Sequence, residues 1–242
     1  MIASLPMYDW PELTAAHDKW WQKLGGKLRT AGIDAPQFLT RDGNDECHWL
    51  EPELLLGQTC GYPFSTILQG KVQYLATPVY DVEGCSGPYY SSAIIVRRDS
   101  SLTMEMLGHG CFAFNGEMSL SGYRCVKAMA GEPRTFFSSL RESGGHRASA
   151  GMVANGGADV AALDAVCWHL LQEHEPAIAD KLKVLGWTAQ YPALPLITSL
   201  ETNPGAVEKI RKVLSQITPP VALAIKEFEI LAAAEYDKLS ML

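Results

Sequence analysis

The chain has 242 residues, 47% of them hydrophobic and 19% charged, a composition typical of a compact globular protein with one large or two small domains rather than a disordered or fibrous one. Its 20 Lys and Arg residues against 27 Asp and Glu residues give a net charge of -7, and no segment concentrates the basic residues, so nucleic acid is not an expected partner. No apolar run reaches the roughly 18 residues needed to cross a bilayer, so no membrane insertion is expected.

The N-terminus has no basic region followed by a long apolar core, so the sequence predicts no secretory signal in this chain. Two alternatives stay open: a cytoplasmic protein, or a protein whose signal has been removed. The six cysteines include no Cys-x-x-Cys pair, which favours buried reduced thiols over a disulfide framework or a zinc site. Cys60 and Cys85 are the exception, because both lie in Gly-rich turns that could face one another.

Strands and helices alternate in the first part of the chain. Residues 2–7 form a short apolar strand, and Asp9 is expected to cap a helix that the Gly25-Gly26 pair ends. The next expected elements are a strand at 54–56, a helix at 64–69, a strand at 72–80 and a loop at 81–88.

The same alternation continues to the C-terminus. The expected strands are 93–96, 111–115, 136–140, 158–163, 183–188 and 194–198. The expected helices are 123–130, one that opens at 143–146 and ends at 156–157, one from Asp164 to His174, and two closing helices at 207–217 and 221–231. This order predicts an α/β protein with mostly parallel sheets.

The turns between strands and helices are rich in hydroxyls and glycines. Ligands of open α/β sheets bind at such turns, where hydroxyls and helix N-terminal N–H groups suit an oxyanion. Ordinary helix capping also explains each single turn. Asp164 caps its helix in either case, and if exposed it could select a ligand with a positive end. The candidate ligand-binding residues are Tyr8, Thr59, Cys60, Gly61, Tyr62, Asn115, Ser119, Ser121, Gly122, His146 and Asp164.

Known enzyme signatures are missing from the sequence. It has no Gly-x-Ser-x-Gly, no phosphate-binding Gly-x-x-x-x-Gly-Lys-Ser/Thr, no His-Glu-x-x-His and no Gly-x-Gly-x-x-Gly. His169 and His174 are five residues apart, so they do not share a helix face and are not expected to bind a metal. We therefore expect no metal, no cofactor and no catalytic residues.

Five segments, taken in order, resemble the periplasmic phosphate and phosphonate substrate-binding proteins of ABC transporters. They are 4–8, 54–63, 84–92, Asn115 with 119–122, and 143–146 followed by 158–164. The resemblance implies a two-lobed type II periplasmic-binding-protein fold with mostly parallel sheets, flanking helices and two hinge crossings. It implies lobe 1 at 1–91, lobe 2 at 92–188 and a return to lobe 1 at 189–242, with the lobes closing on a ligand in the cleft.

The resemblance also assigns roles. Ser119, Ser121 and Gly122 match a turn whose hydroxyls and N–H groups hold phosphoryl oxygens, and His146 matches a second anion contact. Tyr8 and the 59–62 turn match contacts from the first lobe. Asp164 matches an acidic position that can meet a ligand's amine. A periplasmic location and an ABC permease partner are implied for an exported protein.

Our leading hypothesis is a solute-binding protein that captures a phosphonate, phosphate or phosphate ester by hinge closure. The absence of a signal and the short chain keep two alternatives open. One is a small enzyme on the same fold, with Cys60, His146 or Asp164 as the reactive group. The other is a cytoplasmic ligand sensor that signals to a protein partner.

Overall fold

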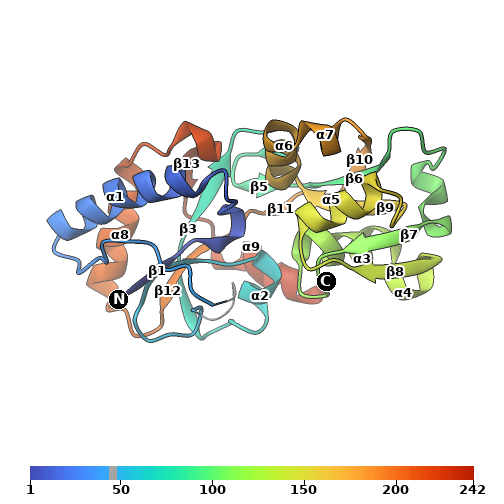
Figure 1. Cartoon of the computed structure of the whole chain (residues 1–242). Coiled ribbons are helices and arrows are strands. Elements are labelled where there is room, and N and C mark those ends of the chain that lie inside the picture. Colours follow the sequence, from blue (N-terminus) through green and yellow to red (C-terminus); the bar gives the residue numbers. More distant parts are fainter. Residues whose placement is uncertain (44–47) are drawn as a thin grey trace. The chain divides into compact units, whose positions relative to one another are not determined.

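The computed structural model describes residues 1–43 and 48–242, and Cys47 lies outside these described residues. The chain forms two compact units, residues 1–81 with 192–240 and residues 82–191 with 241–242 (Figure 1). Residues 82–91 therefore belong to the second unit, whereas the sequence-based lobes at 1–91, 92–188 and 189–242 stay a prediction. Across the described residues, no helix combines the length and the apolar character that a membrane span requires.

A five-stranded mixed sheet forms the centre of the first unit. Its order is β1 (Ile2–Ser4), β2 (Leu54–Gln58), β12 (Leu196–Ser199), β3 (Val72–Tyr80) and β13 (Ile225–Glu229). β1 runs parallel to β2, whereas β12 is antiparallel to both β2 and β3 and β13 is antiparallel to β3. All five residues of β2 are buried, as expected of an interior strand.

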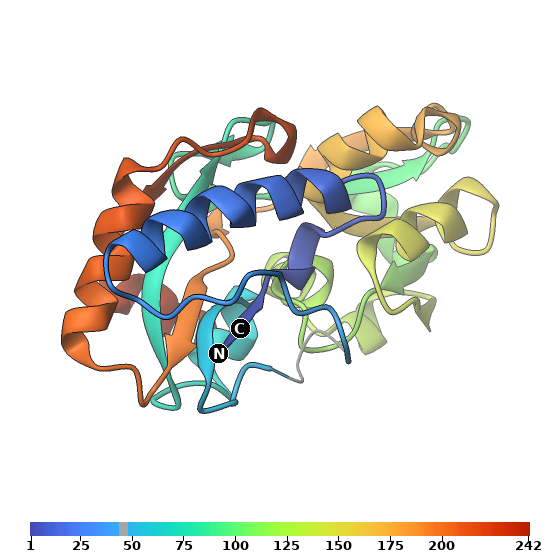
Figure 2. The ribbon, with the colours of Figure 1, turned by 60° about the vertical axis from the view of Figure 1, so that its left-hand side comes forward.

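Two long helices pack against each other in the first unit. Figure 2 shows α1 (Thr14–Thr30) beside α8 (Pro204–Gln216), with the edge strand β13 close to them. The shorter helices are α2 (Gly61–Ser65) and α9 (Ala233–Asp237), and 3₁₀ turns span Pro6–Tyr8, Val221–Leu223 and Lys238–Met241.

The second unit also has a five-stranded mixed sheet. Its order is β10 (Leu182–Trp187), β6 (Ser92–Arg97), β9 (Val160–Asp164), β7 (Cys111–Phe114) and β8 (Ser139–Glu142). β7 is parallel to β8 and β9, whereas β6 is antiparallel to β9 and β10. The remaining elements are the short strands β4 (Cys85–Ser86), β5 (Tyr89–Tyr90) and β11 (Tyr191–Pro192), a 3₁₀ turn at Met104–His109, a π-helical turn at Leu120–Arg124, and helices α3 (Cys125–Ala130), α4 (Pro133–Phe136), α5 (His146–Ala154), α6 (Ala165–His174) and α7 (Pro176–Ala179).

An aromatic core supports this second sheet. The rings of Phe112 and Phe137 stack with their centroids 4.5 Å apart, and Phe114 lies beside Phe112 and Tyr123. Because β7 and β9 are parallel, their carboxyl ends lie at the same edge of the sheet. The segments that follow these two strands are therefore neighbours, which positions the site described below.

The α/β class is confirmed, but the expectation of mostly parallel sheets is wrong, because both five-stranded sheets mix the two orientations. Two element boundaries also need correction. Helix α1 begins at Thr14 rather than after Asp9, and it continues through Gly25 and Gly26. A Cβ at Gly25 would lie 3.3 Å from the Trp21 ring, so this glycine allows close packing inside the helix.

The second closing helix, expected at 221–231, is absent, because Ile225–Glu229 is the strand β13. This segment adds to the free edge of β3, whose backbone supplies its hydrogen-bond partners. Ala224, with φ of 52°, sits immediately before the strand and prevents a continuous helix.

Candidate functional site

Three polar side chains from three elements meet in the second unit. Ser121 lies in the π-helical turn, His146 is the first residue of α5, and Asp164 is the last residue of β9. The Ser121 Oγ is 2.8 Å from the His146 Nε2, and this nitrogen is 3.2 Å from the Asp164 Oδ2. Ser121 and Asp164 are only 4% and 2% exposed, so these contacts are made almost entirely out of water.

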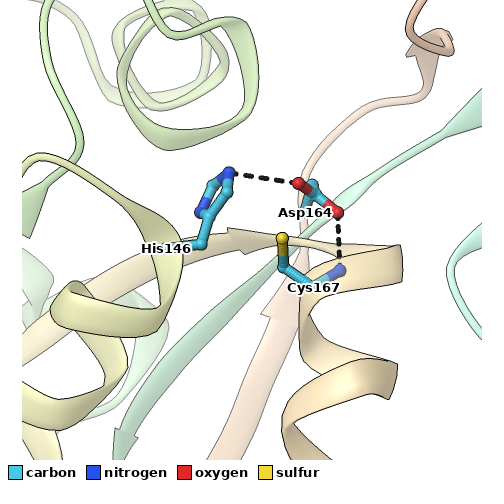
Figure 3. Close-up of side chains that lie close together, drawn as sticks. All are labelled: His146, Asp164 and Cys167. Atoms are coloured by element: carbon cyan, nitrogen blue, oxygen red, sulfur yellow. Dashed lines mark hydrogen bonds and ion pairs between the residues drawn. The ribbon is translucent and has the colours of Figure 1, made fainter. Parts of the chain in front are cut away.

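Backbone groups fix the orientation of this cluster. Asp164 caps α6, because its Oδ1 accepts a hydrogen bond of 2.7 Å from the Cys167 N–H. The Nδ1 of His146 lies 3.1 Å from the carbonyl oxygen of Ala162. Because a carbonyl can only accept a hydrogen bond, Nδ1 carries a proton and donates it to this oxygen. The other ring nitrogen, Nε2, is thereby turned toward Ser121 and Asp164, and Figure 3 shows it pointing at the Asp164 carboxylate.

The Asp164 carboxylate remains charged although it is buried. Burial alone would raise the pKa of Asp164, but the neighbouring His146 charge and the hydrogen bonds from His146 and Cys167 outweigh it and lower that pKa. Both carboxylate oxygens are engaged, Oδ1 by the Cys167 N–H and Oδ2 by His146. The Asp164 carboxylate is therefore held in place as an ion-pair partner of His146.

A second group of predicted residues forms the turn that carries Ser121. The Ser119 Oγ accepts a hydrogen bond of 2.9 Å from the Gly122 N–H, and the Asn115 amide lies 3.4 Å from the same oxygen. A Cβ at Gly122 would lie 2.7 Å from the Asn115 amide, so the close approach requires glycine. The Asn115 Oδ1 is buried and has no hydrogen-bond partner among the described residues.

The turn itself is π-helical. The Arg124 N–H donates to the Ser119 carbonyl at 3.0 Å, a wider ring than in an α-helix. The N–H groups of the first helical turn have no acceptor within a helix, and π-helical turns are frequent at functional sites. Here the N–H groups of Gly122, Tyr123 and Arg124 donate to the Oγ or the carbonyl of Ser119, so they are engaged within the turn.

The remaining predicted residues belong to the first unit. Tyr8 is buried, with its ring edge-on to Tyr80 at 5.6 Å. Thr59 is fully buried, and its hydroxyl lies 3.4 Å from the carbonyl of Cys60, the N-cap of α2. Gly61 is buried and Tyr62 half-buried in α2.

The six residues Asn115, Ser119, Ser121, Gly122, His146 and Asp164 are thus brought together inside the second unit. Sequence reasoning missed Cys167 and the Ala162 carbonyl. The spacing could have indicated Cys167, because the third residue after an N-cap places its N–H on the cap side chain.

The cluster differs from a hydrolytic triad. In a Ser-His-Asp triad, the serine and the aspartate contact opposite ring nitrogens. Here Ser121 and Asp164 both lie at Nε2 of His146, and Nδ1 faces a backbone carbonyl. This arrangement does not relay a proton from the serine to the aspartate.

Two thiols of the second unit, Cys85 and Cys167, are not activated nucleophiles, because each has a raised pKa. Burial, with a contribution from Asp164, raises the pKa of Cys85 to about 12. Burial first, and then the charge of Asp164 and a side-chain hydrogen bond with it, raise the pKa of Cys167. Within the second unit, the described cysteines Cys85, Cys111, Cys125 and Cys167 form no disulfide with one another.

Comparisons with solved structures agree with this fold. A binding-protein component of an ABC phosphonate transporter from Pseudomonas aeruginosa is 18% identical with a TM-score of 0.73, over 97% of this chain and 82% of that one. PhnD1 from Prochlorococcus marinus in complex with methylphosphonate is 15% identical with a TM-score of 0.76, over 99% and 95%. XAC2383 from Xanthomonas citri bound to ATP is 17% identical with a TM-score of 0.71, over 100% and 95%.

The fold and the sequence together define a transport-type substrate-binding protein. The family described as the phosphonate periplasmic substrate-binding protein of ABC transporters matches residues 56–238. No curated protein matches the chain. Because the match covers most of its length, the chain belongs to this phosphonate-binding family, and its role is to bind a solute.

Proposed function

We propose that the solute is a small oxyanion of the phosphonate, phosphate or phosphate-ester type, and that the donors around Ser121 hold its oxygens. The observation that carries the proposal is the contact of 2.8 Å between Ser121 and His146 at the start of two helical segments. Hydroxyl groups and the N–H groups at helix N-termini suit an oxyanion, because each can donate a hydrogen bond to one of its oxygens. They do so without a charged side chain.

His146 and Asp164 would prepare the serine. When Nε2 carries a proton, it can donate to the Asp164 carboxylate, and the Ser121 oxygen then has no need to donate to the ring. Its hydroxyl hydrogen is left for the ligand. In this proposal Asp164 acts on the ligand through His146, and the sequence-based role of meeting a ligand amine would fall to other groups.

The rest of the predicted site completes the proposal. Tyr8 and the turn of Thr59, Cys60, Gly61 and Tyr62 would supply contacts from the first unit, with backbone N–H groups and aromatic surface. Closure of the two units about the chain crossings would bury the anion. Delivery to an ABC permease in the periplasm would follow, as expected for a member of this family.

Two ligand classes deserve equal weight in the test. The similar Prochlorococcus protein is described with methylphosphonate, and the similar Xanthomonas protein with ATP. A phosphonate and a nucleotide share the phosphoryl oxygens but differ greatly in size. The oxyanion chemistry of Ser121 suits both, so the size of the ligand must be measured.

Calorimetric titration of the full chain tests the proposal. The protein is unfolded, dialysed and refolded in a phosphate-free buffer to remove any copurified anion, and a thermal-shift screen selects the compounds to titrate. The screen contains methylphosphonate, 2-aminoethylphosphonate, phosphite, phosphate, ATP and methanesulfonate. A ligand at 100 times its Kd should stabilise the fold by about 2.7 kcal/mol.

We expect binding by at least one phosphorus compound and none by the sulfonate. Binding only by compounds that lack phosphorus would overturn the proposal, as would the absence of any response. Phosphorus NMR of the bound mixture separates binding from turnover. An unchanged ligand spectrum supports a binding protein, and new signals would favour the enzyme alternative.

A further inference from the structure

His146, Asp164 and Cys167 offer a nitrogen, an oxygen and a sulfur that lie within 4.8 Å of one another (Figure 3). The ligand atoms come from the first turn of α5, the end of β9 and the first turn of α6, which are anchored to the same sheet. All three side chains are buried or nearly so, unlike the exposed acidic groups that gather on protein surfaces without a ligand.

The spacing of two of these atoms fits a shared metal ion. Two ligands that bind a tetrahedral metal at about 2.0–2.1 Å are separated by about 3.3 Å. The Nε2 of His146 and the Oδ2 of Asp164 are 3.2 Å apart. A thiolate in the same coordination sphere would lie about 3.6 Å from the nitrogen. The sulfur of Cys167, already within 4.8 Å, could reach that position by a small side-chain movement.

The surrounding hydrogen bonds are those of a supported metal ligand set. A metal-binding histidine usually donates its other ring N–H to a carbonyl or carboxylate, which fixes the ring and its tautomer. The Nδ1 of His146 makes such a contact with the Ala162 carbonyl at 3.1 Å. The Oδ1 of Asp164 is held by the Cys167 N–H at 2.7 Å, so Oδ2 has a fixed direction.

We propose that His146 Nε2, Asp164 Oδ2 and Cys167 Sγ form a binding site for a transition-metal dication, with Zn²⁺ the best match. When the metal binds, the Cys167 thiol proton and the Nε2 proton are released to solvent. One carboxylate and one thiolate then balance the double positive charge of the metal, and the imidazole adds a neutral ligand. A sulfur and nitrogen donor set selects zinc or a neighbouring metal rather than Mg²⁺ or Ca²⁺, which prefer oxygen. The sequence alone predicts no metal site, because the spacing of His146, Asp164 and Cys167 does not match a recognised metal-binding motif.

The metal would occupy the place of the proton between His146 and Asp164. Ser121 lies 2.8 Å from the same ring nitrogen, so the fourth coordination position would face its hydroxyl. Three protein ligands with one open position are typical of zinc sites that bind a further oxygen. The metal-bound form and the form with a protonated Nε2, which the oxyanion proposal uses, are alternative states of His146, and the metal site is tested with no phosphoryl compound present.

The test is a Co²⁺ titration of the chelator-treated full chain in anion-poor buffer. Thiolate ligation should produce a near-ultraviolet sulfur-to-cobalt charge-transfer band that saturates at one equivalent. Competition with a chromophoric chelator then gives the Zn²⁺ affinity. Cys167→Ser should remove the band and weaken Zn²⁺ binding at least tenfold, whereas Cys111→Ser should retain both.

His146→Gln removes a second ligand of the proposed site, since a glutamine is a poor zinc ligand. Circular dichroism and the thermal midpoint of each variant show whether it has folded. Absence of the band in the folded wild type, or a band that survives in folded Cys167→Ser, would overturn the metal site. Neither result bears on the Ser121 oxyanion proposal, which is measured separately with phosphonates.

Discussion

Each unit places a histidine beside an aspartate, but the two pairs have different surroundings. In the first unit, the His17 Nδ1 is 3.3 Å from the Asp9 Oδ1, and Arg41 also binds Asp9 and lies 2.7 Å from Asp18. In the second unit, Asp164 meets His146 and the Cys167 N–H. The carboxylate of the first pair is shared with a guanidinium, whereas the carboxylate of the second pair serves a histidine and a helix N-terminus.

This difference shows how similar residue pairs acquire different roles. Arg41 already compensates the charge of Asp9, and burial, the largest influence, lowers the pKa of His17 despite Asp9. The His146 charge contributes to the lowered pKa of Asp164, and Ser121 lies at the same ring nitrogen. The first pair is a structural contact, and the second pair belongs to the cluster for which we propose a role in binding a ligand or a cation.

Removing Asp164 should produce the largest effect. Asp164→Ala leaves a buried histidine without its carboxylate and α6 without its N-cap, so we expect a loss of about 3–5 kcal/mol in unfolding free energy. Urea denaturation followed by circular dichroism measures it. Asp164→Asn keeps a capping oxygen and removes the charge, so it should recover about 1 kcal/mol of the loss. A loss below about 1 kcal/mol in Asp164→Ala would mean that the pair contributes little.

Gly122→Ala should have the next largest effect. The added Cβ would lie 2.7 Å from the Asn115 amide and 3.0 Å from the Ser119 Oγ, so the turn must open, at a cost of about 2–3 kcal/mol. Urea denaturation measures this loss too. Gly151→Ala is the matched control, because nothing lies within 4 Å of its added Cβ and alanine favours the α5 helix by about 1 kcal/mol. Equal stabilities of the two variants would contradict the packing argument.

The sequence predicted local features of both units well. Asp164 precedes an apolar run, so an N-cap and helix α6 follow from the short reach of its side chain to the Cys167 N–H. Strand β3 was predicted with its observed bounds at Val72–Tyr80. Both features depend on interactions between residues that are near in sequence.

Long-range features were not predictable in the same way. Ser121 and His146 are 25 residues apart, and their contact depends on the parallel pairing of β7 with β8, because Ser121 follows β7 and His146 follows β8. The strand at Ile225–Glu229 depends on the open edge of β3, although its apolar spacing also fits a helix. The Gly25-Gly26 pair looks like a helix end in the sequence, but α1 continues through it, and Gly25 packs closely against the Trp21 ring of the same helix.

The hydroxyls of the two units should differ in their effect on ligand affinity. The Ser121 hydroxyl lies beside His146, whereas the buried Thr59 hydroxyl faces the neighbouring Cys60 carbonyl. Ser121→Ala should weaken binding of the phosphorus ligand about tenfold, or about 1.4 kcal/mol, since a hydrogen bond to a charged group is lost. The nearly isosteric Thr59→Val should change the Kd less than about twofold. Calorimetric titration gives both values, and a larger effect at Thr59 would reverse the comparison.

The smallest expected effect is the pH dependence that His17 contributes. Burial lowers its pKa below the model-compound value of 6.5, so the folded protein resists a proton that the unfolded chain accepts. Stability is therefore present above pH 6.5 and is lost as the pH falls toward the lowered pKa. His17→Gln should flatten the decline in unfolding free energy between neutral and mildly acidic urea titrations, whereas replacing the exposed His109 by Gln should leave it unchanged. An equally steep decline in His17→Gln would show that the pair with Asp9 keeps His17 as easily protonated in the folded state as in the unfolded chain.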